Sequence, residues 1–540
     1  MTKETSTRTG DASTEMEQDT QLQLFRNLGN GAWTILKDSK YGDGISFGIY
    51  CALGDPGRRS KFLADPGWDL RVTAGAPGFS QGGGETTYHR DWSDDGVEPL
   101  VLQREFHGAR EDYVEIQQEF RLFHNLAVDR QTGNLIKPHD DGTEEVAVKF
   151  DGKQVLVRTR LIKQYMAARQ MDLHLYIDSV VYGSNGDAMP EEWVIETDDT
   201  RLELHTPKRV PFDKPFSRLL GKKILPPGPI ETSGVWPFEA PEEYPEFIIG
   251  EDEHGRPVRF TCDPDQLADY FGKNSEAPHY LTPVHFRKEV LQKYYDRPEL
   301  YSVSDGGVRC AALWSCRIDN DHADRVIVFL GDLGRDLPAS ERDYWRGFMI
   351  TPDAKISETN FRRSFLGQFT DPKSVDLIFK RRYDDVNKAW SNLYGWPLFR
   401  TPEGPDKHLF SRLRLPLNDS QAEFESSIRV LTQLLVDALN EKQIDSLLSN
   451  KEPNERGISK LGRVFAQEEH LREIDVTVLR SLQEVRSKVT AHRKGSDYEK
   501  VLDKNFGDRR GREAIETLMQ DLLDWLSEVL ESLPDSDRPS

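Results

Sequence analysis

The sequence predicts a multidomain α+β protein: a β-rich N-terminal domain, a mixed α/β central domain and a C-terminal all-α helical bundle. Three observations lead to this class. Short alternating apolar runs between glycine- and proline-containing turns dominate residues 21–210. Strand-like and helix-like runs mix over residues 259–400. Apolar residues at three- and four-residue spacing recur over residues 420–533, which is typical of amphipathic helices.

Two further segments differ from these domains in composition. Residues 1–20 are rich in Thr, Ser, Glu and Asp, and we expect a disordered tail there. Residues 211–258 hold many prolines, and we expect them to connect the N-terminal and central domains. A chain of 540 residues is long enough for about two to four domains, each with its own core.

The N-terminal domain contains a clear hairpin signal. Val146–Val157 alternates apolar and polar residues around an Asp-Gly pair, which predicts two strands joined by a tight turn. A short helix over residues 161–170 and a half-buried strand over residues 172–182 are expected to follow. Residues 113–123 combine alternation with helical spacing, so both structures remain open there.

The central domain mixes helix and strand patterns. Asp263, followed by a proline, is expected to cap a first helix. The remaining pattern predicts a helix over residues 283–295, strands over 308–318 and 325–330, and helices over 341–348 and 373–394.

The C-terminal region reads as helical throughout. Ser420 is placed to cap a helix with an apolar stripe that reaches Leu439. Longer helices are expected over residues 475–490 and 513–533, and shorter ones over 443–448 and 458–465. An antiparallel bundle of four or five helices is the simplest arrangement for these elements.

Composition limits the classes of function. The formal net charge of −21 repels nucleic acid at long range, so contact with RNA or DNA requires a local basic patch. The best candidate for such a nucleic-acid patch lies between Phe361 and Tyr383, where a solvated helix face is the alternative interpretation. Its basic residues are Arg362, Arg363, Lys380, Arg381 and Arg382.

The sequence shows no membrane span, and its cysteines lack the spacing of a zinc site. It has no apolar run of about 18 residues and no apolar segment near its start, so neither a membrane span nor a signal peptide is expected. Cys51, Cys262, Cys310 and Cys316 are few for this length and lack the C-x-x-C spacing of zinc sites. We therefore expect a cytoplasmic protein with no metal and no cofactor.

Two polar loops in the central domain are weaker candidates for chemistry. Residues 319–324 combine three Asp with one His, which suits either a hard cation or, more simply, a hairpin turn between two strands. Gly331–Asp336 follows an apolar strand, where α/β folds often place ligand sites, but it lacks the spacing of a phosphate-binding loop. A local ion pair between Arg335 and Asp336 is the alternative.

The most informative pair is Arg486 and His492. An imidazole transfers protons near neutral pH, and a guanidinium holds phosphate oxygens with a planar fork of donors. These are the groups needed for attack of a ribose 2′-hydroxyl on its own phosphate without a metal. The two residues lie six positions apart, about 240° around a straight helix, and Gly495 predicts that the helix ends near His492.

A helical bundle bearing this R-x5-H spacing resembles the HEPN superfamily (higher eukaryotes and prokaryotes nucleotide-binding). The resemblance covers residues 420–533 and implies an R-x4–6-H site at Arg486 and His492, with Ser487, Arg493 and Lys494 in support. Ser487 departs from the Asn or Asp often found after the Arg. Many members are metal-independent ribonucleases that act as toxins or as effectors of bacterial antiphage and abortive-infection systems. The regions before the bundle are similar to uncharacterised bacterial proteins.

The resemblance implies RNA as substrate, a phage or host protein as trigger, and a homodimer. One imidazole serves poorly as base and acid together, whereas two motifs across a two-fold axis supply both. Two alternatives remain open. The bundle could mediate dimerisation in a non-catalytic sensor or interaction protein, or an enzyme site could lie near Gly331–Asp336 in the central domain.

Overall fold

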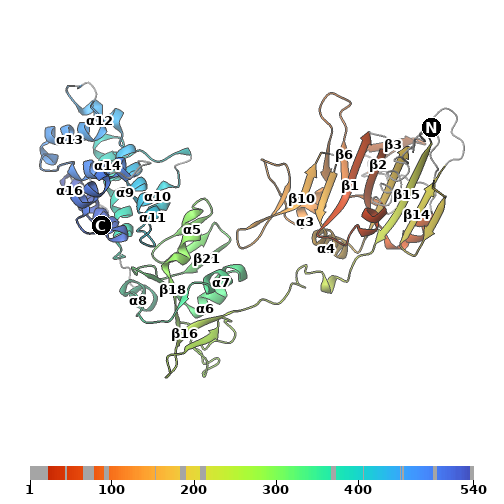
Figure 1. Ribbon diagram of the computed structural model, residues 1–540, viewed down its shortest axis with the longest axis horizontal. Helices are drawn as coiled ribbons and strands as arrows, with labels where there is room; N and C mark the ends of the chain where they lie inside the picture. Colours follow the sequence, from red (N-terminus) through yellow and green to blue (C-terminus); the bar gives the residue numbers. More distant parts are fainter. Residues whose placement is uncertain are drawn as a thin grey trace, which may run out of the picture. The chain divides into compact units, whose positions relative to one another are not determined.

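The computed structural model describes residues 22–42, 45–64, 78–89, 97–152, 154–182, 190–206, 215–366, 372–404, 407–450, 452, 455–489 and 496–534. Strands dominate its N-terminal part and helices its C-terminal part (Figure 1), which confirms the multidomain α+β class. The chain forms two compact units. The first comprises Met1–His139 with Thr143–Pro241, and the second comprises Asp140–Gly142 with Glu242–Ser540.

Eleven of the described strands form one antiparallel sheet in the first unit. In spatial order they are β13 (Trp193–Glu196), β14 (Thr200–His205), β15 (Phe216–Leu225), β12 (Asp172–Tyr182), β2 (Ile45–Gly54), β1 (Trp33–Gly42), β11 (Gln154–Arg158), β10 (Glu144–Asp151), β9 (Leu135–Pro138) and β8 (Ala127–Val128), with β5 (Val97–Pro99) beside β2. Helix α4 (Thr159–Arg169) buries Leu161, Tyr165 and Met166 in the core of this unit.

Most expected elements of the first unit are present. The predicted hairpin is confirmed as β10 and β11, with Asp151 opposite Gln154 at the turn. Residues 113–123 contain both of the structures left open: strand β7 (Tyr113–Ile116) precedes helix α3 (Gln118–Phe123). Strand β12 is more deeply buried than its alternation predicted, because β2 and β15 flank it on both edges within the large sheet.

The connector expected over residues 211–258 is wrong for part of its length. Phe216–Leu225 is strand β15, which pairs with β12 along its whole length. Glu246–Glu251 and Pro257–Thr261 form the hairpin of β16 and β17 in the second unit. Residues 226–245, where the prolines concentrate, hold no strand. Proline has no backbone N–H and cannot donate a hydrogen bond within a sheet. The connector is therefore limited to the segment in which the prolines are concentrated.

The first half of the second unit is a small α+β region. One sheet contains β22 (Arg325–Phe329), β18 (Pro283–Arg287) and β23 (Met349–Ile350), and another contains β19 (Tyr301–Val303), β20 (Gly307–Cys310) and β21 (Trp314–Arg317). Its helices are α5 (Gln292–Asp296), α6 (Leu330–Asp336), α7 (Ala339–Arg346) and α8 (Glu358–Phe365). Trp345 lies fully buried in the core, and its indole donates to the Tyr294 hydroxyl at 2.7 Å.

Of the helices expected in this region, one is absent from the described residues and one starts later than expected. Asp263 caps a turn instead of a helix, because its carboxylate accepts from the Asp265 amide two residues on. The helix expected over residues 283–295 begins as strand β18, and helical structure starts at Lys288, with a 3-10 turn that leads into α5. Val284 and Phe286 alternate into the core between β22 and β23, so tertiary pairing outweighs the local helical pattern.

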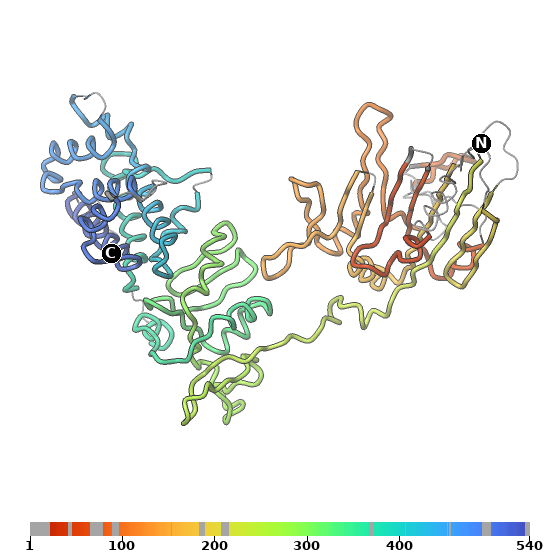
Figure 2. The backbone as a smooth tube through the Cα atoms, in the orientation of Figure 1, coloured from red at the N-terminus to blue at the C-terminus, as the bar shows by residue number. Residues whose placement is uncertain are grey.

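Helices fill the rest of the second unit, as expected for the bundle (blue in Figure 2), but the described part holds more of them than the four or five expected. They are α9 (Val375–Tyr394), α10 (Leu409–Arg412), α11 (Gln421–Thr432), α12 (Glu441–Leu447), α13 (Gly457–Gln467), α14 (Thr477–Val489), α15 (Ser496–Phe506) and α16 (Gly511–Ser532). Ser420 caps α11 by accepting from the Glu423 amide. No described helix combines the length and hydropathy of a membrane span.

Helix α9 belongs to the bundle and not to the central domain, whose expected end at residue 400 is therefore too late. Its buried side chains, from Val375 to Trp390, share one hydrophobic core with α16. Trp390 is 0% exposed and lies against Phe465 of α13, with ring centroids 6.4 Å apart. The 20-residue length of α9 allows it to reach across the whole core.

Candidate anion-binding site on the helical bundle

Helix α14 positions Arg486 by burying its opposite side. The helix starts where the Asp475 carboxylate accepts from the Thr477 amide, and Leu479, Leu482 and Val485 are almost completely buried in the bundle core. Arg480, Gln483 and Arg486 follow each other at three-residue spacing on the polar side. The sequence of α14 thus fixes one row of polar side chains along the bundle surface.

Arg486 forms an ion pair with Asp437, which lies 49 positions earlier in the chain. Its Nη1 donates to Oδ1 and its Nη2 lies against Oδ2, both at 3.1 Å. Asp437 is the last residue of a π-helical turn, Gln433–Asp437, that continues α11. Such turns widen a helix locally and are frequent at functional sites. Here the turn places the Asp437 carboxylate within reach of α14.

A second guanidinium also reaches Asp437. The Arg400 side chain donates from Nη2 to the Asp437 backbone carbonyl at 2.9 Å. The Arg400 amide donates to the neighbouring Ala438 carbonyl at 2.7 Å, next to a short bridge between Phe399 and Leu439. The segment after α9 is therefore held against the end of the π-helical turn, and two arginines from distant parts of the bundle meet at one residue.

This meeting point lies on the wall of a cavity of about 840 Å³. The cavity is bounded by the segment after α9, the end of the π-helical turn, and parts of α12, α13 and α14. Its basic lining residues are Arg400, Lys442, Arg456 and Arg480, and its acidic ones are Asp437, Glu441 and Glu455. The volume lies within the range of about 300–1,000 Å³ that is usual for ligand sites.

The charge of this cavity is more positive than its composition indicates. Asp437 is paired with Arg486, Glu441 with Lys460 at 3.0 Å, and Glu455 with Arg463 at 2.7 Å. All three of these cations lie outside the cavity lining. The three carboxylates are thus paired with cations outside the lining, while the basic lining residues face the cavity.

The side chains of Lys442, Arg456 and Arg480 make no hydrogen bond or ion pair with any residue that the structure describes. All three are exposed. An excess of cations without carboxylate partners around one concave surface attracts anions and holds them by charge-assisted hydrogen bonds. The chain as a whole has a net charge of −21, so this cavity is a local region of positive charge on an acidic protein.

The structure places only part of the predicted R-x5-H site. Arg486 lies in the last turn of α14, and Ser487 donates from its hydroxyl to the Gln483 carbonyl at 2.8 Å within the same helix. His492, Arg493 and Lys494 lie outside the described residues. The described part of α14 ends at Val489, close to the expected end at residue 490.

The candidate nucleic-acid patch in the central region is divided between two helices. Arg362 and Arg363 lie on α8, where they pair with Glu358 and Asp305, respectively. The other three candidates lie on α9, where burial lowers the pKa of Lys380 and Arg381 is exposed. Because these residues have separate surroundings, a role for Arg362, Arg363, Lys380, Arg381 and Arg382 in binding nucleic acid stays a prediction.

The polar loop over residues 319–324 connects β21 to β22 and holds the starts of two helices. Asp319 accepts from the Ser357 amide and hydroxyl, both at 2.7 Å, ahead of α8. Asp321 accepts from the Ser374 amide at 3.0 Å, ahead of α9. These bonds use the carboxylates as helix-start acceptors, which explains the acidic loop without a cation.

The glycines of Gly331–Asp336 serve close packing within α6. A Cβ atom at Gly331 would lie 2.1 Å from the Tyr280 ring, and one at Gly334 would lie 1.9 Å from the Cys262 carbonyl oxygen. Arg335 and Asp336 form the ion pair named above as the alternative, at 2.6 Å. The loop expected after β22 is therefore a short helix.

Sequence reasoning missed Asp437, Arg400, Arg456 and the cavity that joins them to α14. Asp437, Arg400 and Arg456 come from three separate segments of the chain, and only the spacing of Arg480, Gln483 and Arg486 carried a local signal. Comparison of the chain with protein-family models, with curated proteins and with solved structures finds no match.

Proposed function

We propose that this protein is a metal-independent endoribonuclease with a HEPN-like site on its helical bundle. The cavity beside Arg486 binds the RNA backbone, Arg486 stabilises charge on the scissile phosphate, and His492 transfers the proton. The observation that carries the proposal is the contact of Arg486 with Asp437 at the wall of a cavity that has an excess of cations.

The cavity supports RNA as the ligand because its chemistry matches a phosphodiester backbone. Arg456 and Arg480 are free to pair with phosphate oxygens, and Gln483 lies beside them for polar contact. Phosphate contacts position a nucleic acid without reading its sequence. A substrate strand bound here brings a phosphate to the end of α14, where Arg486 and Ser487 lie.

The Arg486–Asp437 pair supports a catalytic role for the arginine. Asp437 engages both terminal nitrogens of the guanidinium, and each of these nitrogens carries two N–H groups, so it can bond to more than one acceptor. The Arg486 side chain is 36% exposed, so part of it is accessible from the surface of the bundle. An arginine whose direction is fixed before substrate binds loses less conformational freedom during the reaction.

The proton transfers require more than one imidazole. We propose that two copies of the chain pair through their bundles, so that His492 of one copy acts as base and His492 of the other as acid. In this proposal the N-terminal and central regions sense a phage or host signal in the bacterial cytoplasm and release the nuclease. The chain then acts as an effector of antiphage defence.

The test uses the purified full-length chain and labelled RNA in EDTA. The wild type and Arg429→Ala should produce fragments with 2′,3′-cyclic phosphate ends, while Arg486→Ala and His492→Ala should not. Arg429 is a matched control, because it is an exposed arginine of α11 outside the cavity lining. RNA integrity in bacteria that express each variant covers the case of a cellular trigger. Equal RNA integrity for all four proteins, both in vitro and in cells, contradicts the proposal and favours the non-catalytic alternative.

A further inference from the structure

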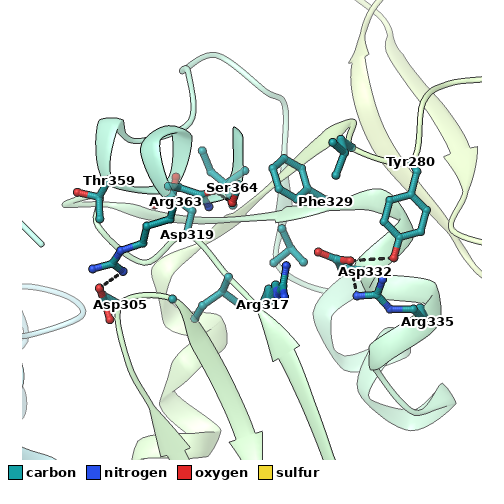
Figure 3. Close-up of a pocket in the computed structure, with 16 residues that line it drawn as sticks. Tyr280, Asp305, Arg317, Asp319, Phe329, Asp332, Arg335, Thr359, Arg363 and Ser364 are labelled. Atoms are coloured by element: carbon teal, nitrogen blue, oxygen red, sulfur yellow. Dashed lines mark hydrogen bonds and ion pairs between the residues drawn. The ribbon is translucent and has the colours of Figure 1, made fainter. Parts of the chain in front are cut away.

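The central region contains a second cavity, of about 460 Å³, that is separate from the nuclease site proposed above. It lies between β21, β22 and helices α6 and α8 (Figure 3). One wall is apolar, with Ile318, Ile327 and Phe329 among its residues. The opposite ends of the cavity carry charged side chains. A concave, half-apolar site of this volume suits a small molecule.

Two of the three arginines that line the cavity already have carboxylate partners. Arg363 of α8 pairs with Asp305, in the turn between β19 and β20. Arg335 of α6 pairs with Asp332 at 2.8 Å and with Asp336 at 2.6 Å. These pairs form the two polar ends of the cavity. The Arg363–Asp305 end holds one charge of each sign, and the Arg335 end holds one cation against two carboxylates.

Arg317 is the exception. It is the last residue of β21 and is exposed, and its side chain makes no hydrogen bond or ion pair with a residue in the described part of the chain. Figure 3 shows Arg317 between the Arg363–Asp305 pair and the group around Asp332. Among the three lining arginines, Arg317 is therefore the one whose guanidinium has no carboxylate partner among the described residues, and it can pair with an anionic ligand. Asp319 also lines the cavity, where its carboxylate accepts from the Ser357 amide and hydroxyl.

The end around Asp332 is rigid. The Tyr280 hydroxyl donates to Asp332 Oδ1 at 2.8 Å, and Arg335 Nη2 donates to the same atom at 2.8 Å. The Asp332 side chain is only 6% exposed, and the Arg335 guanidinium lies 5.5 Å from the centre of the Tyr280 ring. The Tyr280 ring packs directly on Gly331, where a Cβ atom would lie 2.1 Å from it. These contacts define a fixed polar boundary for a ligand.

We propose that this cavity binds a small organic anion, with the phosphate or carboxylate of the ligand paired to Arg317 and its body against Ile318, Ile327 and Phe329. Arg317 supplies a planar fork of donors that fits either anionic group. The apolar wall can bury apolar surface of an organic ligand, which favours binding, whereas inorganic phosphate has no such surface. The cavity volume matches a ligand of about the size of a nucleoside monophosphate.

The test measures binding to the full-length chain by isothermal titration calorimetry. The probes are the four common nucleoside 5′-monophosphates, benzoate, phenyl phosphate and inorganic phosphate. At least one organic probe should bind wild type saturably, with inorganic phosphate at least about 10-fold weaker. Phosphate esters binding better than benzoate identify an organic phosphate, and the reverse order identifies a carboxylate.

Two variants connect the binding to the site. Arg317→Ala should weaken the best probe about 10- to 100-fold, the loss expected for one charged hydrogen-bonding partner. Arg309→Ala should bind as wild type does, because Arg309 is an exposed arginine on the same hairpin outside the cavity lining. Circular dichroism checks that both variants fold. The proposal is overturned if no organic probe binds wild type, or if folded Arg317→Ala binds the best probe with unchanged affinity. The experiment measures ligand binding and not RNA cleavage. A negative result would therefore leave the proposal on the nuclease site unaffected.

Discussion

Arg486 and Asp437 form a bidentate ion pair, with Nη1 and Nη2 of the guanidinium each 3.1 Å from a different carboxylate oxygen. The pair connects the last turn of α14 to the π-helical turn that follows α11. Because Arg486 is 36% and Asp437 42% exposed, water weakens their attraction, and the pair adds little stability. Its effect is geometric: it fixes the direction of the arginine beside the cationic cavity.

Replacing Asp437 with Asn should therefore affect catalysis more than folding. We expect kcat for RNA cleavage to fall about 10-fold, since Asp437 positions Arg486. KM should stay the same or fall, because the change removes a carboxylate from the wall of the cavity that binds RNA. The free energy of unfolding should change by less than about 1 kcal/mol. Steady-state kinetics and urea unfolding measure the two quantities. A mutant with normal kcat contradicts the positioning role.

The cationic cavity should be visible in the salt dependence of RNA binding. Arg456→Ala and Arg480→Ala each remove one cation that has no partner among the described residues. For single-stranded RNA, each should reduce the slope of log affinity against log salt by about 0.7 and weaken binding of different sequences uniformly. Fluorescence anisotropy at several NaCl concentrations measures the slope. Arg429→Ala is the control and should leave it unchanged, whereas an equal change in all three variants argues against a local site.

The sequence predicted what depends on local pattern and missed what depends on contact between distant segments. The helices α11, α14 and α16 follow from their apolar spacing, and the β10–β11 hairpin follows from its Asp-Gly turn. Strand β15 was missed, since it is held by pairing with β12 and β14, which lie outside its own segment of the chain. In the candidate site, Arg486 was identifiable from spacing, but Asp437 was not. A π-helical turn and a partner 49 residues away leave no local signature.

The bundle core makes a clear prediction about stability. Trp390 is 0% exposed and packs its ring against Tyr394 and Trp396, with centroids 4.5 and 5.7 Å away. Trp390→Ala should cost about 3–5 kcal/mol, because it leaves a large cavity. Trp390→Phe should cost less than half as much. It keeps an aromatic ring and removes an indole N–H that has no hydrogen-bond partner in the described structure. Urea unfolding of both variants measures the difference, and equal costs would show that the aromatic packing is not what stabilises this position.

Buried His174 should make the first unit sensitive to mild acid. Its ring stacks on Phe62 with centroids 4.1 Å apart, and a Cβ atom at the facing Gly54 would lie 2.0 Å from the imidazole. Burial lowers the pKa of His174 to about 4; Asp172 opposes this shift, while Arg59 and Lys222 add to it. Asp172 is in turn held by Arg59, with two contacts of 2.6 Å. The imidazole is therefore neutral in the folded protein at neutral pH.

The sign of the pH effect follows from this pKa. The ordinary pKa of histidine is about 6.5, so the unfolded chain takes up a proton near that pH while folded His174 does so only near pH 4. The contribution of neutral His174 to the free energy of unfolding is therefore fully present above pH 6.5. It is lost as the pH falls from 6.5 to 4, by up to about 1.4 kcal/mol per pH unit. Hydrogen exchange of β2 and β12, corrected for intrinsic rates, should show this loss between pH 7.5 and 5.5. His174→Leu should reduce it, and His254→Leu, at an exposed histidine, should not. If His174→Leu keeps the full pH dependence, the destabilisation arises elsewhere in the unit, for example at His124, which is also buried and has a pKa of about 4.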